Sequence, residues 1–126
     1  MAAVFAVMCA LAGIWSAIKY QATYHALLGS LPPQFQDPLN SRYAFPEYVL
    51  HPSTPLALQT DFVKAQAGGC FAMLCFSLSC FIGGQTTGSW LALAGSFAIA
   101  ASTIKAWRIY KENCNRPLAR VDREEP

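Results

Sequence analysis

The stretch that decides the fold of this chain runs from Ala65 to Thr103 and reads AQAGGCFAMLCFSLSCFIGGQTTGSWLALAGSFAIAAST. No charged residue lies between Lys64 and Lys105. A membrane-spanning helix needs about 20 mostly apolar residues, so this stretch is long enough to cross a bilayer twice. The polar, glycine-rich segment GGQTTGS, residues 83–89, divides it near its middle. The sequence therefore predicts a hairpin of two transmembrane helices.

The composition of the whole chain also indicates a membrane protein. Of the 126 residues, 54% are hydrophobic and only 13% are charged, whereas charged residues make up about a quarter of an ordinary soluble domain. A further apolar segment, AAVFAVMCALAGIWSAI, lies at the N-terminus. We therefore expect an all-α integral membrane protein with three spans, at about residues 2–18, 65–82 and 88–104. Residues 1–126 then form a single membrane domain.

The distribution of basic residues predicts the orientation of the spans. No Lys or Arg precedes Lys19, and none lies between Lys64 and Lys105. Because Lys and Arg favour the cytoplasmic side, residues 19–64 and the tail 105–126 are expected in the cytoplasm, with the N-terminus outside. Cleavage of the first segment as a signal peptide is disfavoured, because its start carries no positive charge. The basic residues flank the spans without forming a dense stripe, which favours membrane lipids over nucleic acid as partners.

Small side chains recur at helical spacing within the predicted spans. Gly68 and Ala72 are four residues apart in the second span, and the third carries a longer stripe at the same spacing, formed by Gly88, Ala92, Ser96 and Ala100. Such rows allow two helices to approach closely in lipid, where packing replaces the hydrophobic driving force. The second and third spans are therefore expected to pack together. Similar rows in the first span predict contact with another helix, whose identity stays open.

The segment between the first two spans is rich in proline and aromatic residues. Residues 31–55 carry six of the eight prolines. Disordered linkers are usually poor in aromatic residues, but this segment contains four, Phe35, Tyr43, Phe45 and Tyr48. We therefore expect an ordered cytoplasmic segment whose aromatic residues are candidates for contacting a partner. The prolines are too scattered to favour a polyproline ligand of SH3 or WW domains.

Proline and glycine also predict where the helices end. The first helix is expected to continue past Lys19 and to end near Gly29, because Pro32 and Pro33 follow. Ser53 or Thr54 is expected to cap the second helix, with Pro55 in its first turn. The third is expected to continue through residues 105–113 before Pro117.

The residues that usually carry chemistry show no recognised arrangement. The five cysteines form no CxxC pair and are interpreted as packing residues. No catalytic residue, metal site or cofactor is predicted, although His25 and His51 are candidates for binding a cofactor near the membrane surface. No ionisable Asp, Glu, Lys, Arg or His lies inside a predicted span. That pattern argues against a proton-coupled transporter, which normally places such residues within the membrane.

The order of features resembles small bacterial inner-membrane proteins of the universal stress protein B type. The resemblance covers an N-terminal span, then a helix and proline turn, here YHALLGSLPPQF at residues 24–35, and a segment that leads to a C-terminal membrane region. This chain differs in the tight hairpin of its second and third spans and in lacking a strongly charged middle segment. The resemblance implies a bacterial inner (cytoplasmic) membrane and no site residues.

These observations favour a non-enzymatic small membrane protein, an accessory or assembly subunit of a larger membrane complex. The alternative is a redox-associated or ligand-binding membrane protein, with a quinone, haem or lipid site at the membrane surface near His25 and His51. A homo-oligomeric pore built from the small-residue faces is a third hypothesis. The sequence contains neither a phosphate-binding loop nor a nucleophile elbow, so no residues are proposed as the active site of an enzyme.

Overall fold

The computed structural model describes residues 1–115, and within them the chain contains helices and no strand. The α-helices are α1 (Ala2–Leu28), α2 (Pro38–Val49), α3 (Leu56–Ile82) and α4 (Thr86–Asn115), and a short 3-10 helix, η1, covers Pro33–Phe35. The predicted all-α class is confirmed. Part of the predicted C-terminal tail, residues 116–126, lies outside the described residues.

Three helices, α1, α3 and α4, are long and apolar enough to cross a membrane. They contain 27, 27 and 30 residues, and a helix of 27 residues is about 40 Å long at 1.5 Å per residue. The hydrocarbon core of a bilayer is about 30 Å thick. Each helix is therefore longer than the hydrocarbon core is thick. Accordingly, α1, α3 and α4 extend beyond the predicted spans 2–18, 65–82 and 88–104.

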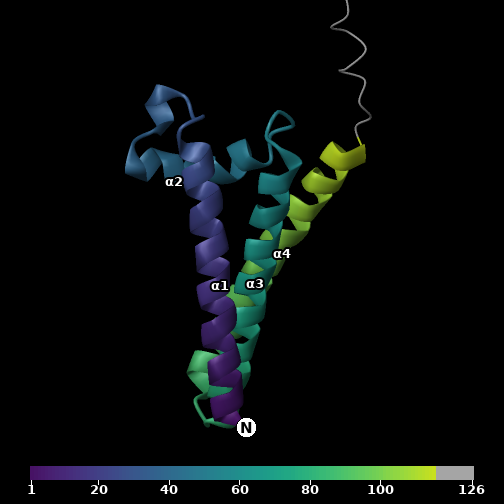
Figure 1. The fold of residues 1–126 in the computed structure, drawn as a ribbon. Coiled ribbons are helices and arrows are strands. Elements are labelled where there is room, and N and C mark those ends of the chain that lie inside the picture. The colour runs from purple at the N-terminus through teal and green to yellow at the C-terminus, as the bar shows by residue number, and fades with distance from the viewer. Residues whose placement is uncertain (116–126) are drawn as a thin grey trace, which may run out of the picture.

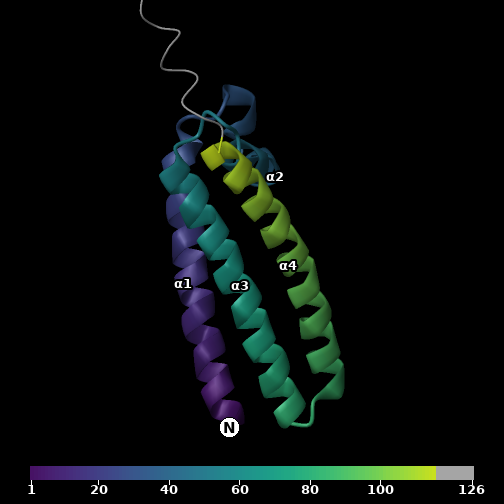
Figure 2. The same ribbon diagram turned by 90° about the vertical axis from the view of Figure 1, so that its right-hand side faces the viewer.

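The long helices form a row in which α3 lies between the other two and runs antiparallel to both (Figures 1 and 2). Figure 1 shows α1 and α4 diverging toward the end of the molecule where α2 lies. Within the described part of the chain, the backbones of α1 and α4 do not approach each other. We call residues 29–55 the cap, the end that holds them the cap end, and the opposite end the turn end. The N-terminus lies at the turn end (Figure 2).

The connection between α3 and α4 is short because a glycine reverses the chain. Gly84 has a φ of 77°, a left-handed conformation that glycine adopts without steric cost. The Gln85 N–H donates to the Cys80 carbonyl at 2.9 Å, and the Gly84 N–H donates to the Phe81 carbonyl at 3.1 Å. This pair of hydrogen bonds is a Schellman motif, which satisfies the last carbonyls of α3.

The start of α3 differs from the expectation drawn from the sequence. Pro55 is the N-cap, not a residue of the first turn, and no side chain caps the helix. The Thr54 hydroxyl instead donates to the Tyr48 carbonyl at 2.7 Å, and the Ser53 hydroxyl lies 2.7 Å from Nδ1 of His51. The side chains of both predicted N-cap residues therefore make their hydrogen bonds within residues 29–55 and not to the first turn of α3. At the end of α1 the structure agrees with the sequence, because the helix ends at Leu28 with Gly29 as its C-cap.

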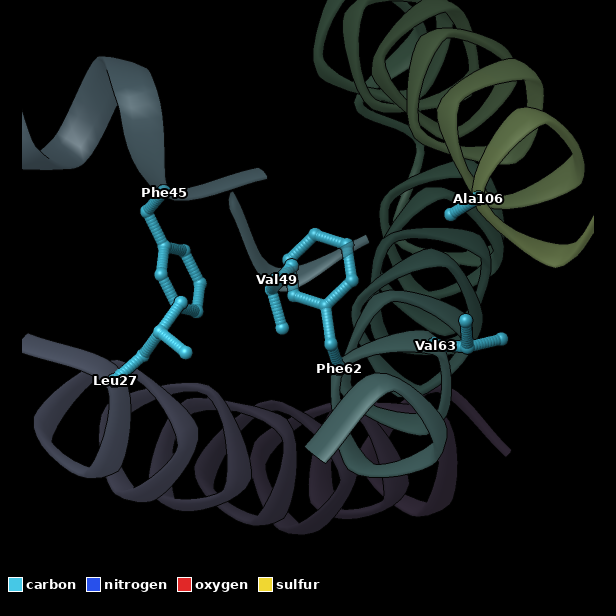
Figure 3. Packing of buried hydrophobic residues seen from close by; sticks show 6 residues of the cluster. All are labelled: Leu27, Phe45, Val49, Phe62, Val63 and Ala106. Carbon is cyan, nitrogen blue, oxygen red and sulfur yellow. The ribbon is translucent and has the colours of Figure 1, made fainter. Parts of the chain in front are cut away.

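The main hydrophobic core lies at the cap end, where all four α-helices meet. It consists of Leu27 from α1, Phe45 and Val49 from α2, Phe62 and Val63 from α3, and Ala106 from α4. Figure 3 shows Phe45 extending from α2 toward Leu27, with Phe62 beside Val49. The ring centroids of Phe45 and Phe62 are 5.5 Å apart in an edge-to-face arrangement, which adds to the stabilisation from burial. The cap is thus packed onto the long helices.

Candidate functional site

The face of α3 that carries Gly68 and Ala72 packs against α1. A Cβ on Gly68 would lie 3.0 Å from the ring of Trp15, and one on Gly13 would lie 3.9 Å from the Ala72 Cβ. The Ser16 hydroxyl also donates to the Ala65 carbonyl of α3 at 2.6 Å. Gly68 and Ala72 therefore meet the first span instead of the third, and Gly13 and Ser16 of the first span contact α3.

The small-residue stripe of the third span lies partly against α3. Ala92 and Ser96 are buried, and a Cβ on Gly88 would lie 3.6 Å from Sγ of Cys80. Ala100 is half-buried. Hydrogen bonds join the same two helices, because the Ser89 hydroxyl donates to the Ser77 carbonyl at 3.1 Å. The contacts between α3 and α4 thus combine close packing with polar links, as is common between helices in membranes.

An open groove runs between α1 and α4, with α3 as its floor. It has a volume of about 700 Å³, and its lining includes Gly13 and Ala17 of α1, Gly69 and Ala72 of α3, and Ala98 and Ile99 of α4. The groove exists because α1 and α4 both pack on α3 without touching each other within the described residues. We call it the α1–α4 groove.

A second cavity lies at the cap end of this groove, between α2, α3 and α4. It has a volume of about 410 Å³ and is lined by residues that include Glu47, His51, Phe62, Lys105 and Ile109. Gln66 and Ser102 line both cavities, so the two adjoin at these side chains. We call the second cavity the cap pocket. Both volumes fall in the range of roughly 300–1,000 Å³ that is typical of ligand sites.

The structure does not place the two histidines at one site. His51 lines the cap pocket, and its Nδ1 lies 2.7 Å from the Ser53 hydroxyl. His25 is exposed near the end of α1, with its ring centroid 5.5 Å from that of Tyr24, and it lines neither cavity. Among residues 1–115, no three His, Cys, Asp or Glu side chains lie close enough to hold a metal ion.

The four aromatic residues proposed as partner contacts have different environments. Phe45 is fully buried and Tyr43 is 85% exposed. Phe35 and Tyr48 are half-buried, and their ring centroids are 5.6 Å apart. Phe45 therefore packs inside the molecule and is not accessible to a partner, because α2 folds onto α1 and α3. Tyr43 is the member of this group that faces outward.

The charged residues concentrate toward the cap end. Every Lys and Arg of the described residues lies in the cap or in the cap-end half of a long helix. Among them, the one ion pair joins Nζ of Lys19 to Oδ1 of Asp61 at 3.2 Å. Lys64 follows Asp61 by three residues on the same helix, but the packing of α1 on α3 makes Lys19 the partner of Asp61.

Several residues of the two cavities were not singled out by sequence reasoning. Glu47 and Lys105 lie far apart in the chain, on α2 and α4, and only the fold places them on one pocket. Gln66 offered a weak signal, since it is an amide just inside the predicted second span. Comparison of the chain with protein-family models, with curated proteins and with solved structures finds no match.

Proposed function

We propose that this chain is a non-enzymatic integral membrane protein that serves as an accessory or assembly subunit of a larger membrane complex. The observation that supports this proposal most directly is the 85% exposure of Tyr43 on a cap that is otherwise anchored to the long helices. In this proposal the outward face of α2, with Tyr43 at its centre, contacts the partner.

The cap is held by packing and by hydrogen bonds to the long helices. Phe45 is fully buried in the core. The Tyr24 hydroxyl of α1 lies 2.6 Å from that of Ser41 in α2, and the Asn113 side chain of α4 donates to the Leu50 carbonyl at 3.0 Å. A surface that is already ordered loses little conformational entropy when it binds, which favours recognition.

Tyr43 and its neighbour Arg42 have the chemistry of an interface anchor. Both are exposed, and Tyr and Arg are enriched among residues that dominate binding energy at protein interfaces. A tyrosine ring buries a large area on binding while its hydroxyl keeps a hydrogen-bonding partner. A lone exposed tyrosine at a membrane surface also suits the headgroup region, so the experiment below must separate a protein partner from lipid.

The proposed location is the bacterial inner membrane, with the cap and the C-terminus in the cytoplasm and the N-terminus outside. The concentration of Lys and Arg toward the cap end supports this orientation through the positive-inside bias. Reporter fusions at Gln85, in the turn between α3 and α4, and at the C-terminus test it. They should report opposite sides of the membrane, and the same side would overturn the assignment.

Photo-crosslinking in the native membrane tests the proposed contact. A photoreactive amino acid at Tyr43 should capture a discrete membrane protein. The same probe at Lys111, which is exposed on α4, should capture it weakly or not at all. The Tyr43→Ser variant of this chain, expressed at the same level, should also co-purify with less of that protein. The proposal would be contradicted if the probe at position 43 crosslinked only to lipid and the detergent-purified protein were a monomer without a bound partner.

A further inference from the structure

The cap pocket and the α1–α4 groove together form a continuous site with polar groups at one end and mostly apolar groups along the rest, which suits an amphiphilic ligand. The cap pocket contains Glu47, His51 and Lys105, whereas the groove continues from Gln66 and Ser102 along apolar and small side chains. Polar groups thus lie at the cap end and apolar groups toward the middle of the long helices. A lipid in a bilayer has the same order along the membrane normal, with its headgroup at the surface and its chains inside.

The direction of the groove follows the helix axes. Its lining runs from Gln21 to Gly13 in α1 and from Ala65 to Met73 in α3, and both series move away from the cap end. An acyl chain in the groove would therefore lie parallel to the helices, as the chains of the surrounding bilayer do. Small residues leave the space that such a chain requires, because their side chains do not fill the gap between α1 and α4.

The cap pocket carries one charge of each sign. Glu47 and Lys105 are both exposed, and both line the pocket. Within residues 1–115 the sole ion pair is the one between Lys19 and Asp61, so Glu47 and Lys105 pair neither with each other nor with another residue in that range. A ligand that carries an anion and a cation can satisfy both, and charge-assisted hydrogen bonds of this kind are the stronger ones.

We propose that the protein binds one zwitterionic phospholipid whose headgroup joins a phosphate to a primary ammonium, the chemistry of phosphoethanolamine. Lys105 binds the phosphate and Glu47 accepts hydrogen bonds from the ammonium. Gln66 and Ser102, at the junction of the two cavities, donate to the ester carbonyls, and one acyl chain occupies the α1–α4 groove. A wholly apolar partner helix in the groove would leave the Gln66 amide without a hydrogen-bond partner, which is costly away from water.

Native mass spectrometry of the full-length protein, purified in detergent, tests the headgroup. The protein is titrated with phosphatidylethanolamine, phosphatidylcholine and phosphatidylglycerol that carry identical chains. We expect one lipid to bind, with phosphatidylethanolamine favoured about tenfold over the other two, a factor equivalent to about 1.4 kcal/mol. The trimethylammonium of phosphatidylcholine has no N–H for Glu47, and phosphatidylglycerol has no cation.

Two variants test headgroup binding and acyl-chain binding separately. Glu47→Gln should bring the affinities for the ethanolamine and choline lipids to within about twofold of each other. Ala98→Phe narrows the groove and should weaken all three lipids. The matched controls are Glu112→Gln and Ala94→Phe, because both residues are exposed on α4 and neither lines either cavity. The controls should bind lipid as the unmodified protein does, and circular dichroism should show the same helix content throughout.

The inference is overturned if the three lipids bind equally, or if Glu47→Gln leaves the preference for ethanolamine unchanged. A photoreactive residue at Ala98 that captures a protein, or a second copy of this chain, in place of phospholipid would also overturn it. None of these three results bears on the proposed contact at Tyr43, because Tyr43 lines neither cavity. Crosslinking at Tyr43 can therefore fail or succeed independently of lipid binding.

Discussion

The side-chain amide of Asn113 donates two hydrogen bonds, one to Oε1 of Gln59 at 2.9 Å and one to the Leu50 carbonyl at 3.0 Å. Gln59 is fully buried, and its own amide donates to the Thr54 carbonyl at 2.9 Å. These bonds join α4, α3 and the cap at a single buried side chain. The Leu50 and Thr54 carbonyls of the cap thereby accept hydrogen bonds from side chains of α4 and α3.

The first prediction concerns this hydrogen-bond network. Asn113→Ala removes the donor to Gln59 and should lower the free energy of unfolding by about 1–3 kcal/mol, because a buried acceptor is left unsatisfied. Asn115→Ala, at an exposed position of the same helix, should change it by less than about 0.5 kcal/mol. Thermal unfolding in detergent micelles measures both. Equal stability of the two variants would show that the network does not hold the cap.

The second prediction concerns the anchor of the cap. Phe45 is fully buried and its ring centroid lies 5.1 Å from that of Tyr20, so Phe45→Ala should lower the free energy of unfolding by about 3–5 kcal/mol. The exposed Tyr43→Ala is the control and should change stability by less than about 0.5 kcal/mol. Limited proteolysis within residues 29–55 should accelerate only for Phe45→Ala. Similar cleavage rates for both would contradict the packing described.

The third prediction concerns the contact between α1 and α3. A Cβ on Gly68 would lie 3.0 Å from the Trp15 ring and 3.3 Å from the Ser16 Cβ, so Gly68→Leu should force the helices apart and cost about 1–3 kcal/mol through overpacking. Ala67→Leu places the same side chain on the neighbouring exposed position and should be tolerated. Unfolding by titration with a denaturing detergent compares them. A tolerated Gly68→Leu would indicate that α1 packs elsewhere.

Much of the helical architecture could be predicted from local sequence. The apolar stretches indicated three helices that can span a membrane, and Gly29 and the Gly83–Gly84 turn indicated where two of them end. Each of these inferences depends on length, hydropathy or backbone freedom, which are properties of neighbouring residues. The start of α3 was predicted less well, because the Thr54 hydroxyl bonds to Tyr48, six residues earlier in the chain.

The candidate site was less predictable because it depends on which helix faces meet. Small residues at Gly68 and Ala72 indicated close packing, but their spacing is the same whichever neighbour they contact. The pairing of Lys19 with Asp61 likewise joins residues 42 positions apart. The placement of Phe45 inside and Tyr43 outside follows from how α2 folds onto the core, and the two residues look alike in the sequence.

The sequence by itself determined that this protein is helical and that three of its helices are long and apolar enough to cross a membrane, because uncharged runs of that length favour the helix wherever water is excluded. Only the tertiary structure decided that α3 lies between α1 and α4, and that Glu47 and Lys105 line one pocket. Those relationships arise from side chains that meet across different helices, and one-dimensional periodicity does not specify which faces meet.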